Sequence, residues 1–209
     1  MATGDALEKE LEARDPDVRL MLQVKDDVQG AFETLVERYQ HRLLGVMVHL
    51  VGRNDEAEDL TQEVFLRIYK ARKGYRPRAK FSTWLFTIAN NLALNHLRSK
   101  GRNPTLAPVG NGNVSQASRL AVELVASSDG TPSTQMRSME LSEVVREALD
   151  GLGEDQKLAV LLSKFEEMSY IEIAAVMGRS ESAVKSLLAR ARMNLRERLE
   201  PYLRSGRRV

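Results

Sequence analysis

The chain has 209 residues, of which 43% are hydrophobic and 29% charged, with a formal net charge of +2 and no cysteine. This composition fits one or two soluble globular domains, and it excludes disulfides and thiolate metal sites. The three histidines, His41, His49 and His96, show no ligand spacing with carboxylates, so no metal, cofactor or catalytic site is expected.

The N-terminus is polar and acidic and lacks the apolar core of a signal peptide. No apolar run approaches the ~18 residues that membrane insertion requires. We therefore expect a cytoplasmic protein.

Apolar residues recur at helical spacing almost throughout, and nothing alternates as a strand would, which predicts an all-α fold. In the first half we expect helices near residues 18–24, 28–51, 54–71 and 82–98. Gly52 and Asn54 supply a stop and a cap, and Asp55-x-x-Glu58 resembles a capping box. Between the last two helices, "KGYRPRAK" (73–80) predicts a basic loop that contains an aromatic residue.

Composition divides the chain into two small helical domains, 1–100 and 139–209, joined by a flexible linker over 101–138. The linker is rich in Gly, Pro, Asn, Ser and Thr, with a possible helical turn at "RLAVELVA". The second domain begins with helices near 140–149 and 154–165.

The end of the second domain predicts a helix-turn-helix. Ser169-x-x-Glu172 forms a capping box, Gly178 suits a left-handed helix end, and Ser180 caps a longer basic helix. On that helix, Lys185 and Arg190 project away from the apolar stripe, together with three small residues: Ser182, Ser186 and Ala189. Such a face fits the major groove, where a good bidentate pair is worth about 1–3 kcal/mol of discrimination. The alternative is a charged face that only keeps the domain soluble.

The second long helix carries acidic and amide side chains at helical spacing: Glu56, Asp59, Gln62 and Glu63, called the acidic ridge below. An acidic ridge repels DNA. It therefore meets either a basic protein surface or water, and the residues alone favour water.

The stretch "FSTWLFTIANNLALNHLR" (81–98) has no Lys, Arg, Asp or Glu before its last residue. One side predicts a buried stripe: Phe81, Leu85, Ile88 and Leu92. The other side, called the uncharged face below, consists of Trp84, Thr87, Asn90, Asn91 and Leu94, and it ends at the charged Arg98. Aromatic rings stack on unpaired bases, and Asn and Thr side chains bind base edges. A central helix whose amides are paired internally explains the composition equally well.

Four segments together resemble the extracytoplasmic-function (ECF) group of bacterial RNA polymerase sigma factors: "AFETLVERY", "DEAEDLTQEVFLRIYKA", "FSTWLFTIANNLALNHLR" and "MSYIEIAAVMGRSESAVKSLLARARMNLRERL". The resemblance covers residues 28–199 apart from the linker. It implies a non-enzymatic specificity subunit that binds core RNA polymerase, recognises promoter DNA, and is restrained by an anti-sigma factor.

The resemblance also implies site residues. The core polymerase contacts are Glu56, Asp59, Gln62, Glu63 and Leu66. The contacts to single-stranded −10 DNA are Tyr75, Arg76, Lys80, Phe81, Thr83, Trp84, Thr87, Asn90, Asn91 and Arg98, with a flipped base held in the loop before Phe81. The contacts to duplex −35 DNA are Arg179, Ser182, Lys185, Ser186, Ala189 and Arg190.

The chain departs from the family pattern at two positions of the basic helix. Members often have Thr where this chain has Ala183 and a basic residue where it has Leu187, and both commonly face phosphate. The departures predict a weaker −35 grip or a shifted docking angle. A helix-turn-helix regulator that binds operators without becoming a polymerase subunit remains as an alternative function, but it explains neither the acidic ridge nor the uncharged face. An enzyme is disfavoured because no phosphate-binding glycine loop or nucleophile–base pairing is present.

Overall fold

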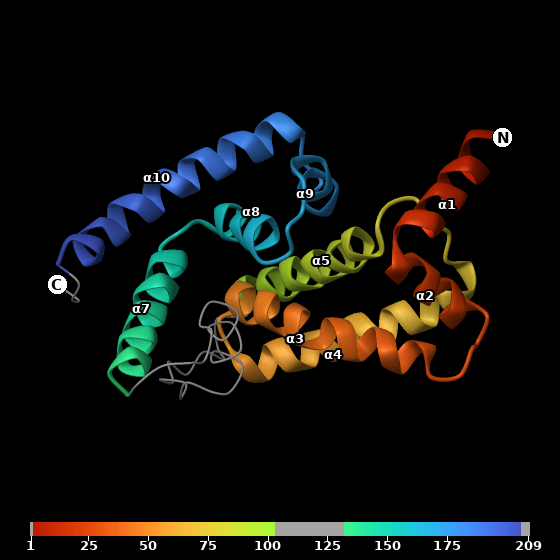
Figure 1. The fold of residues 1–209 in the computed structure, drawn as a ribbon, viewed down its shortest axis with the longest axis horizontal. Helices are drawn as coiled ribbons and strands as arrows, with labels where there is room; N and C mark the ends of the chain where they lie inside the picture. Colours follow the sequence, from red (N-terminus) through yellow and green to blue (C-terminus); the bar gives the residue numbers. More distant parts are fainter. Residues whose placement is uncertain (1, 103–131, 206–209) are drawn as a thin grey trace.

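The computed structural model describes residues 2–102 and 132–205 (Figure 1), and these contain helices and connecting turns but no strand. The N-terminal domain comprises α1 (Ala2–Arg14), α2 (Pro16–Lys25), α3 (Ala31–Val51), α4 (Asn54–Ala71), the short 3-10 helix η1 (Arg72–Gly74) and α5 (Phe81–Arg102). The C-terminal domain comprises α7 (Pro132–Asp150), α8 (Glu154–Lys164), α9 (Tyr170–Met177) and α10 (Glu181–Ser205). The all-α, two-domain prediction is confirmed.

The N-terminal domain forms around a core contributed by α2, α3, α4 and α5. Each helix turns one apolar stripe inward, as its sequence periodicity requires, and α3 buries Leu35, Leu43 and Met47 completely. Met21 of α2 and Phe81 of α5 are also fully buried. The predicted stripe on α5 is therefore in the core, although Ile88 at its edge is only half-buried.

The turn between α3 and α4 differs from its prediction. Gly52 ends α3 in the left-handed conformation (φ 75°), as expected. Helix α4 begins at Asn54 itself, the preceding residue is Arg53, and no side chain caps it. The predicted capping box at Asp55 and Glu58 is therefore wrong, because both positions already lie inside the helix. The Asp55 carboxylate accepts from the Arg53 guanidinium instead (3.1 Å and 2.5 Å).

The helix-turn-helix of the C-terminal domain is confirmed in its local details. The Ser169 amide donates to the Glu172 carboxylate (2.7 Å), and the Glu172 amide donates to the Ser169 hydroxyl, which completes a capping box. Gly178 ends α9 in the left-handed conformation (φ 61°). The Ala183 amide donates to Ser180 Oγ (3.2 Å), so Ser180 caps α10 as predicted.

Helical structure reaches further than the sequence patterns predict at three places. Helix α1 occupies the polar N-terminus, α5 continues to Arg102, and α7 begins at Pro132, a residue favoured in the first helical turn. Residues 101–102 and 132–138 of the predicted linker are thus helical. The rest of the linker, including the turn expected at "RLAVELVA", lies outside the described residues.

The two domains pack directly against each other, with α9 on α5 and α8 on α3 (Figure 1). Their buried apolar residues form one continuous cluster. No sequence pattern predicted this contact, which brings the helix-turn-helix onto the helix that carries the uncharged face. None of the described helices is both long and apolar enough to cross a bilayer.

Candidate nucleic-acid and polymerase interfaces

Three residues of the acidic ridge remain accessible along α4. Asp59 and Gln62 are exposed, and Glu63 is half-exposed beside them. The Glu63 carboxylate accepts from Arg67 Nε (2.8 Å), and this hydrogen bond lowers the pKa of Glu63. Glu63 therefore carries its negative charge throughout the neutral range.

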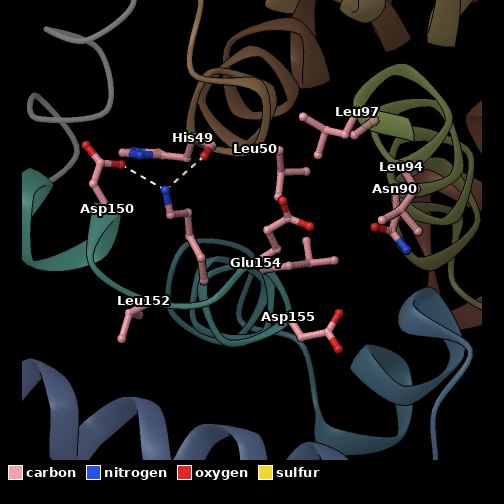
Figure 2. A pocket seen from close by; sticks show the side chains of 12 residues that line it. His49, Leu50, Asn90, Leu94, Leu97, Asp150, Leu152, Glu154 and Asp155 are labelled. Atoms are coloured by element: carbon pink, nitrogen blue, oxygen red, sulfur yellow. Dashed lines mark hydrogen bonds and ion pairs between the residues drawn. The ribbon is translucent and has the colours of Figure 1, made fainter. Parts of the chain in front are cut away.

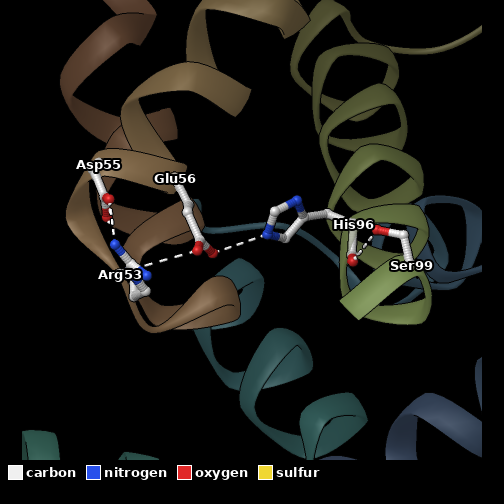
Figure 3. A network of polar contacts seen from close by, with 5 residues as sticks. All are labelled: Arg53, Asp55, Glu56, His96 and Ser99. Carbon is white, nitrogen blue, oxygen red and sulfur yellow. Dashed lines mark hydrogen bonds and ion pairs between the residues drawn. The ribbon is translucent and has the colours of Figure 1, made fainter. Parts of the chain in front are cut away.

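Glu56 does not share the open surface of the other ridge residues. Its carboxylate meets His96 Nε2 of α5 (2.8 Å) and Arg53 Nε (3.5 Å), and its side chain is only 16% exposed (Figure 3). Helical spacing placed Glu56 in line with Asp59. It could not reveal that α5 lies close enough to turn the Glu56 carboxylate inward.

An apolar edge borders the acidic ridge. Leu66 is 52% exposed and Tyr69 42% exposed. The Tyr69 ring packs against Phe32 of α3 (4.9 Å between centroids), and the Arg72 guanidinium lies 3.9 Å from its centroid. Leu66 was among the predicted polymerase contacts and Tyr69 was not, because the position of Tyr69 in the helical pattern did not show that its ring stays at the surface. Acidic groups beside exposed apolar side chains suit a basic, partly apolar protein surface.

The ten predicted −10 residues divide into three groups by exposure. Four are exposed: Arg76, Lys80, Asn91 and Arg98. Two are half-buried: Trp84 and Thr87. Four are buried: Tyr75, Phe81, Thr83 and Asn90. Because Phe81 has no exposed surface, it can act on a ligand only by holding its neighbours.

An aromatic cluster at the start of α5 fixes the position of Trp84. The Trp84 ring lies 4.9 Å from that of Tyr75 and 6.0 Å from that of Phe81. Phe81 in turn packs edge-on against Tyr39 of α3 (5.2 Å). Such aromatic pairs have preferred geometries and hold one another in place. The Trp84 ring is thus held in place while half-buried at the surface.

Two buried hydroxyls near this cluster have no hydrogen-bond partner among the described residues. They belong to Tyr75, which is 5% exposed, and Thr83, which is 3% exposed. Burial raises the pKa of Tyr75, and the nearby Asp15 carboxylate raises it further. An unpaired buried polar group costs about 1–3 kcal/mol. Such groups are uncommon in native proteins and need a physical explanation.

Helix α9 covers part of the uncharged face. The buried Asn90 side chain donates from Nδ2 to the Val176 carbonyl oxygen (3.3 Å), near the C-terminal end of α9. The last carbonyls of a helix have no partner within the helix, so Asn90 supplies one from the other domain. Of the two interpretations of this face, the internally paired amide therefore holds for Asn90. It does not hold for Asn91, which is exposed.

Lys80, a predicted −10 contact, is also engaged by the C-terminal domain. Its Nζ lies 2.9 Å from Glu172 Oε1, and Glu172 belongs to the capping box of α9. Burial alone would raise the pKa of Glu172, but hydrogen bonds from Ser169 and Lys80 outweigh it and lower the pKa. Glu172 is therefore a carboxylate at neutral pH, and it forms an ion pair with Lys80.

A partly buried ion pair joins α3 to the turn between α8 and α9. The Glu166 carboxylate, whose side chain is 1% exposed, accepts from Nε and Nη2 of Arg42 on α3. Burial raises the pKa of Glu166 in spite of the Arg42 charge. Removing one partner of a buried pair leaves an uncompensated charge, which is strongly destabilising.

A cavity of about 210 Å³ lies between the domains (Figure 2). Its apolar lining includes Leu50, Leu94 and Leu152, and Lys157 closes one side by donating to the His49 carbonyl (3.3 Å) and the Asp150 carboxylate (2.8 Å). Burial lowers the pKa of His49, so this imidazole is neutral at pH 7. The cavity belongs to the domain interface and contains part of the uncharged face.

The outward face of α10 is open over its whole N-terminal half. All five of its predicted −35 residues are exposed: Ser182, Lys185, Ser186, Ala189 and Arg190. Lys185 pairs with Glu181 one turn earlier (2.7 Å), and Arg190 Nε donates to the Ser186 carbonyl (3.4 Å). Both pairings are local and exposed, so DNA could replace them at little cost.

The two departures from the family pattern have different surroundings from the −35 residues. Ala183 and Leu187 are half-buried, and Leu187 packs against the hydrophobic core. Arg179, the sixth predicted −35 residue, pairs with Asp155 of α8 (2.7 Å). Leu187 therefore strengthens the packing of α10 where a basic side chain would have reached outward.

The fold and these surfaces define an all-α protein in which a helix-turn-helix domain packs on a helical domain that has an acidic ridge. Residues 35–103 match the family Sigma-70 region 2, and residues 142–195 match Sigma-70, region 4. The chain belongs to the ECF group of this sigma factor family, whose members are transcription initiation factors and not enzymes.

Curated relatives match almost end to end. RNA polymerase sigma-H factor of Pseudomonas aeruginosa is 34% identical over 193 residues, which cover 92% of this chain and 98% of the relative. ECF RNA polymerase sigma-E factor of Escherichia coli (strain K12) is 32% identical over 185 residues, covering 88% of this chain and 95% of the relative.

Two solved structures share the fold. CnrH in complex with the cytosolic domain of CnrY is 23% identical with a TM-score of 0.61, covering 90% of this chain and 99% of that one. The sigma factor RpoE in complex with the anti-sigma factor NepR from Bartonella quintana is 23% identical with a TM-score of 0.63, covering 82% and 98%.

Proposed function

We propose that the protein binds core RNA polymerase, recognises the −35 and −10 elements of a promoter class, and promotes DNA melting. The observation that carries the proposal is the pairing of two different surfaces in one sigma-family chain. One is an open basic face on α10, and the other is an uncharged Trp/Thr/Asn face on α5 flanked by cationic Arg76 and Lys80.

The face of α10 supports recognition of the −35 element as duplex DNA. Its side chains project from the N-terminal half of the second helix of a helix-turn-helix, the part that enters the major groove. Arg190 can donate to guanine O6 and N7, and the small Ser186 and Ala189 allow close approach of the helix to the bases. Arg192, Arg196 and Arg198 lie further along α10 and suit phosphate contacts.

The face of α5 supports capture of unpaired −10 bases. The half-buried Trp84 offers an aromatic ring for stacking, Asn91 offers an amide, and the exposed Arg76 and Lys80 can bind phosphates.

The acidic ridge supports docking on core RNA polymerase. Asp59, Gln62, Glu63 and the exposed Leu66 form one accessible strip on α4. We assign the polymerase contact to these four, and leave Glu56 as a bridge between α4 and α5 because its carboxylate is engaged by His96 and Arg53.

Binding of single-stranded DNA requires the domains to separate. Asn90 is buried under α9 and cannot meet DNA while α9 stays in place, and the exposed Lys80 is paired with Glu172 of α9. In the packed arrangement the α10 face is open, whereas the face of α5 is only partly accessible. We propose that core polymerase favours the separated arrangement in the cytoplasm and that an anti-sigma factor favours a restrained one.

Run-off transcription with purified core polymerase on a promoter library tests the proposal. We expect transcripts from a subset of promoters that share −35 and −10 sequences, and none from core polymerase alone. Binding of the chain to duplex operators without stable association with core polymerase would contradict the proposal and favour a repressor.

A further inference from the structure

Asp15, the single residue between α1 and α2, carries a carboxylate that caps two helices at once. Asp15 is the N-cap of α2, and its Oδ1 accepts from the amides of Asp17 (2.9 Å) and Val18 (3.4 Å). Its other oxygen, Oδ2, accepts from the Phe81 amide (3.0 Å), 66 residues away at the first position of α5. One side chain thus fixes the start of α2 relative to the start of α5.

The C-terminal end of α2 holds the beginning of the loop that leads into α5. Lys25 Nζ donates to the Tyr75 carbonyl (2.9 Å), and Lys73 Nζ donates to the Lys25 carbonyl (2.8 Å). The segment 76–80, which contains Arg76 and Lys80, is therefore attached to α2 at both ends. Helix α2 is itself anchored, because Val18 and Met21 are fully buried and Val24 nearly so.

We propose that Asp15 is a positioning residue for recognition of the −10 element, which rests on the proposed function of α5. By accepting from the Phe81 amide, it sets the point where the loop 76–80 ends and the aromatic cluster begins. Trp84 and Lys80 are then held in a fixed relation before any DNA binds, which lowers the ordering cost of binding. Asp15 and all of α2 precede residue 35, where the match to Sigma-70 region 2 begins.

Two effects of the Asp15 charge predict opposite outcomes. A carboxylate near bound DNA repels phosphates, so its removal would strengthen binding if charge were all that mattered. A carboxylate that holds the loop in place would weaken binding when removed. The sign of the change therefore separates positioning from simple repulsion.

Asp15→Asn isolates the contact to α5. Asparagine has one acceptor oxygen and is as good an N-cap as aspartate, so it can still cap α2. Its amide group would then face the Phe81 amide, and two donors cannot pair. Asp17→Asn is the matched control: it removes the same charge two residues away, where the carboxylate contacts Arg38 and Tyr39 of α3. Its amide oxygen can still accept from Arg38 and its NH2 group can donate to the Tyr39 hydroxyl, so the packing of Tyr39 on Phe81 is kept.

First, the wild-type chain with core polymerase selects its preferred sequence from single-stranded oligonucleotides of random sequence. The affinity of each full-length variant with core polymerase for the selected oligonucleotide, labelled with a fluorophore, is then measured. We expect Asp15→Asn to weaken binding of the selected oligonucleotide about three- to tenfold, the size of a lost cap contact. Core binding and duplex −35 binding should be unchanged, and Asp17→Asn should stay within about twofold of wild type.

Hydrogen exchange of the Phe81 amide gives a second readout that does not involve DNA. Exchange should accelerate in Asp15→Asn and remain slow in Asp17→Asn. Equal or tighter oligonucleotide binding by Asp15→Asn, with the Phe81 amide released, would overturn the positioning role alone. A wild-type chain that selects no oligonucleotide would overturn the proposed function, and the role of Asp15 with it.

Discussion

The two proposed DNA-binding faces differ in how they are stored within one chain. The face of α10 is open, and its polar side chains are held only by exposed local contacts such as Lys185 with Glu181. The face of α5 is partly covered by the other domain, which engages Asn90 and Lys80. A face for duplex DNA can stay in water because water satisfies its charges, whereas an uncharged face gains by being covered.

This difference has a consequence for regulation. The interface that covers α5 is polar at four places, among them the buried pair of Arg42 with Glu166. Polar interdomain contacts are easier to exchange for contacts with a partner than a purely apolar interface would be. The covered face is thus protected from water yet can be released.

The largest effect is expected when the acidic ridge, which we propose binds core polymerase, is changed. Replacing Asp59 and Glu63 by Lys should abolish binding to core polymerase, because like charges would then face a basic partner surface. Glu33→Lys with Glu37→Lys makes the same charge change on exposed positions of α3 and should leave binding intact. Co-purification with core polymerase measures both, and undiminished recovery of the first variant would remove the ridge from the account.

The interdomain pair gives the next largest effect. Arg42→Ala leaves the Glu166 carboxylate buried and unpaired, which should shift the equilibrium toward separated domains by about 1–3 kcal/mol. Small-angle scattering should then report a more extended chain, and affinity for single-stranded DNA should rise even though a positive charge is lost. Adding Glu166→Gln should restore packing, since a neutral amide costs less to bury than an unpaired charge. An Arg42→Ala chain as compact as wild type would show that the pair does not hold the domains.

On the open face, Arg190→Ala should cost about 1–3 kcal/mol at a single −35 base pair, because a base contact discriminates between sequences. Lys185 offers a comparison on the same face, one and a half turns earlier. Binding to a set of duplexes that differ at one position measures the effect. An equal loss on every sequence would identify Arg190 as a phosphate contact.

The smallest effect is expected at the partly covered face. Trp84→Ala should impair promoter opening by about 1 kcal/mol, the lower end of the range for one stacked base, because the half-buried ring can offer only part of its surface. Trp84→Phe, which keeps a ring in the cluster with Tyr75, controls for loss of packing. Permanganate footprints report opening, and a footprint equal to wild type in a folded Ala variant would exclude stacking on Trp84.

Features set by neighbours in the chain could be predicted from the sequence. The capping box of Ser169 with Glu172 and the left-handed Gly178 depend on residues a few positions apart, and both are confirmed. The wrong capping box at Asp55 shows the limit of this approach. Its spacing was correct, but the N-cap position is Arg53, two residues before Asp55, and the Arg53 guanidinium binds the Asp55 carboxylate.

Features set by distant parts of the chain could not be predicted. Asn90 meets Val176 86 residues later, and Arg42 meets Glu166 124 residues later. Periodicity identifies which face of α5 is unusual, but not whether protein or DNA covers it. For the same reason, the sequence could not show that Glu56 turns toward His96 or that Asp15 reaches Phe81.

A reversible lock between the domains tests whether the face of α5 binds unpaired DNA only when α9 leaves it. The chain has no cysteine, so Arg42→Cys with Glu166→Cys can be joined by a short, cleavable thiol cross-linker away from the proposed DNA contacts. The locked chain should bind −35 duplex normally but fail to bind single-stranded −10 DNA. Single-stranded binding should return when the cross-link is cleaved. Equal single-stranded binding by the locked and cleaved chains would contradict this prediction.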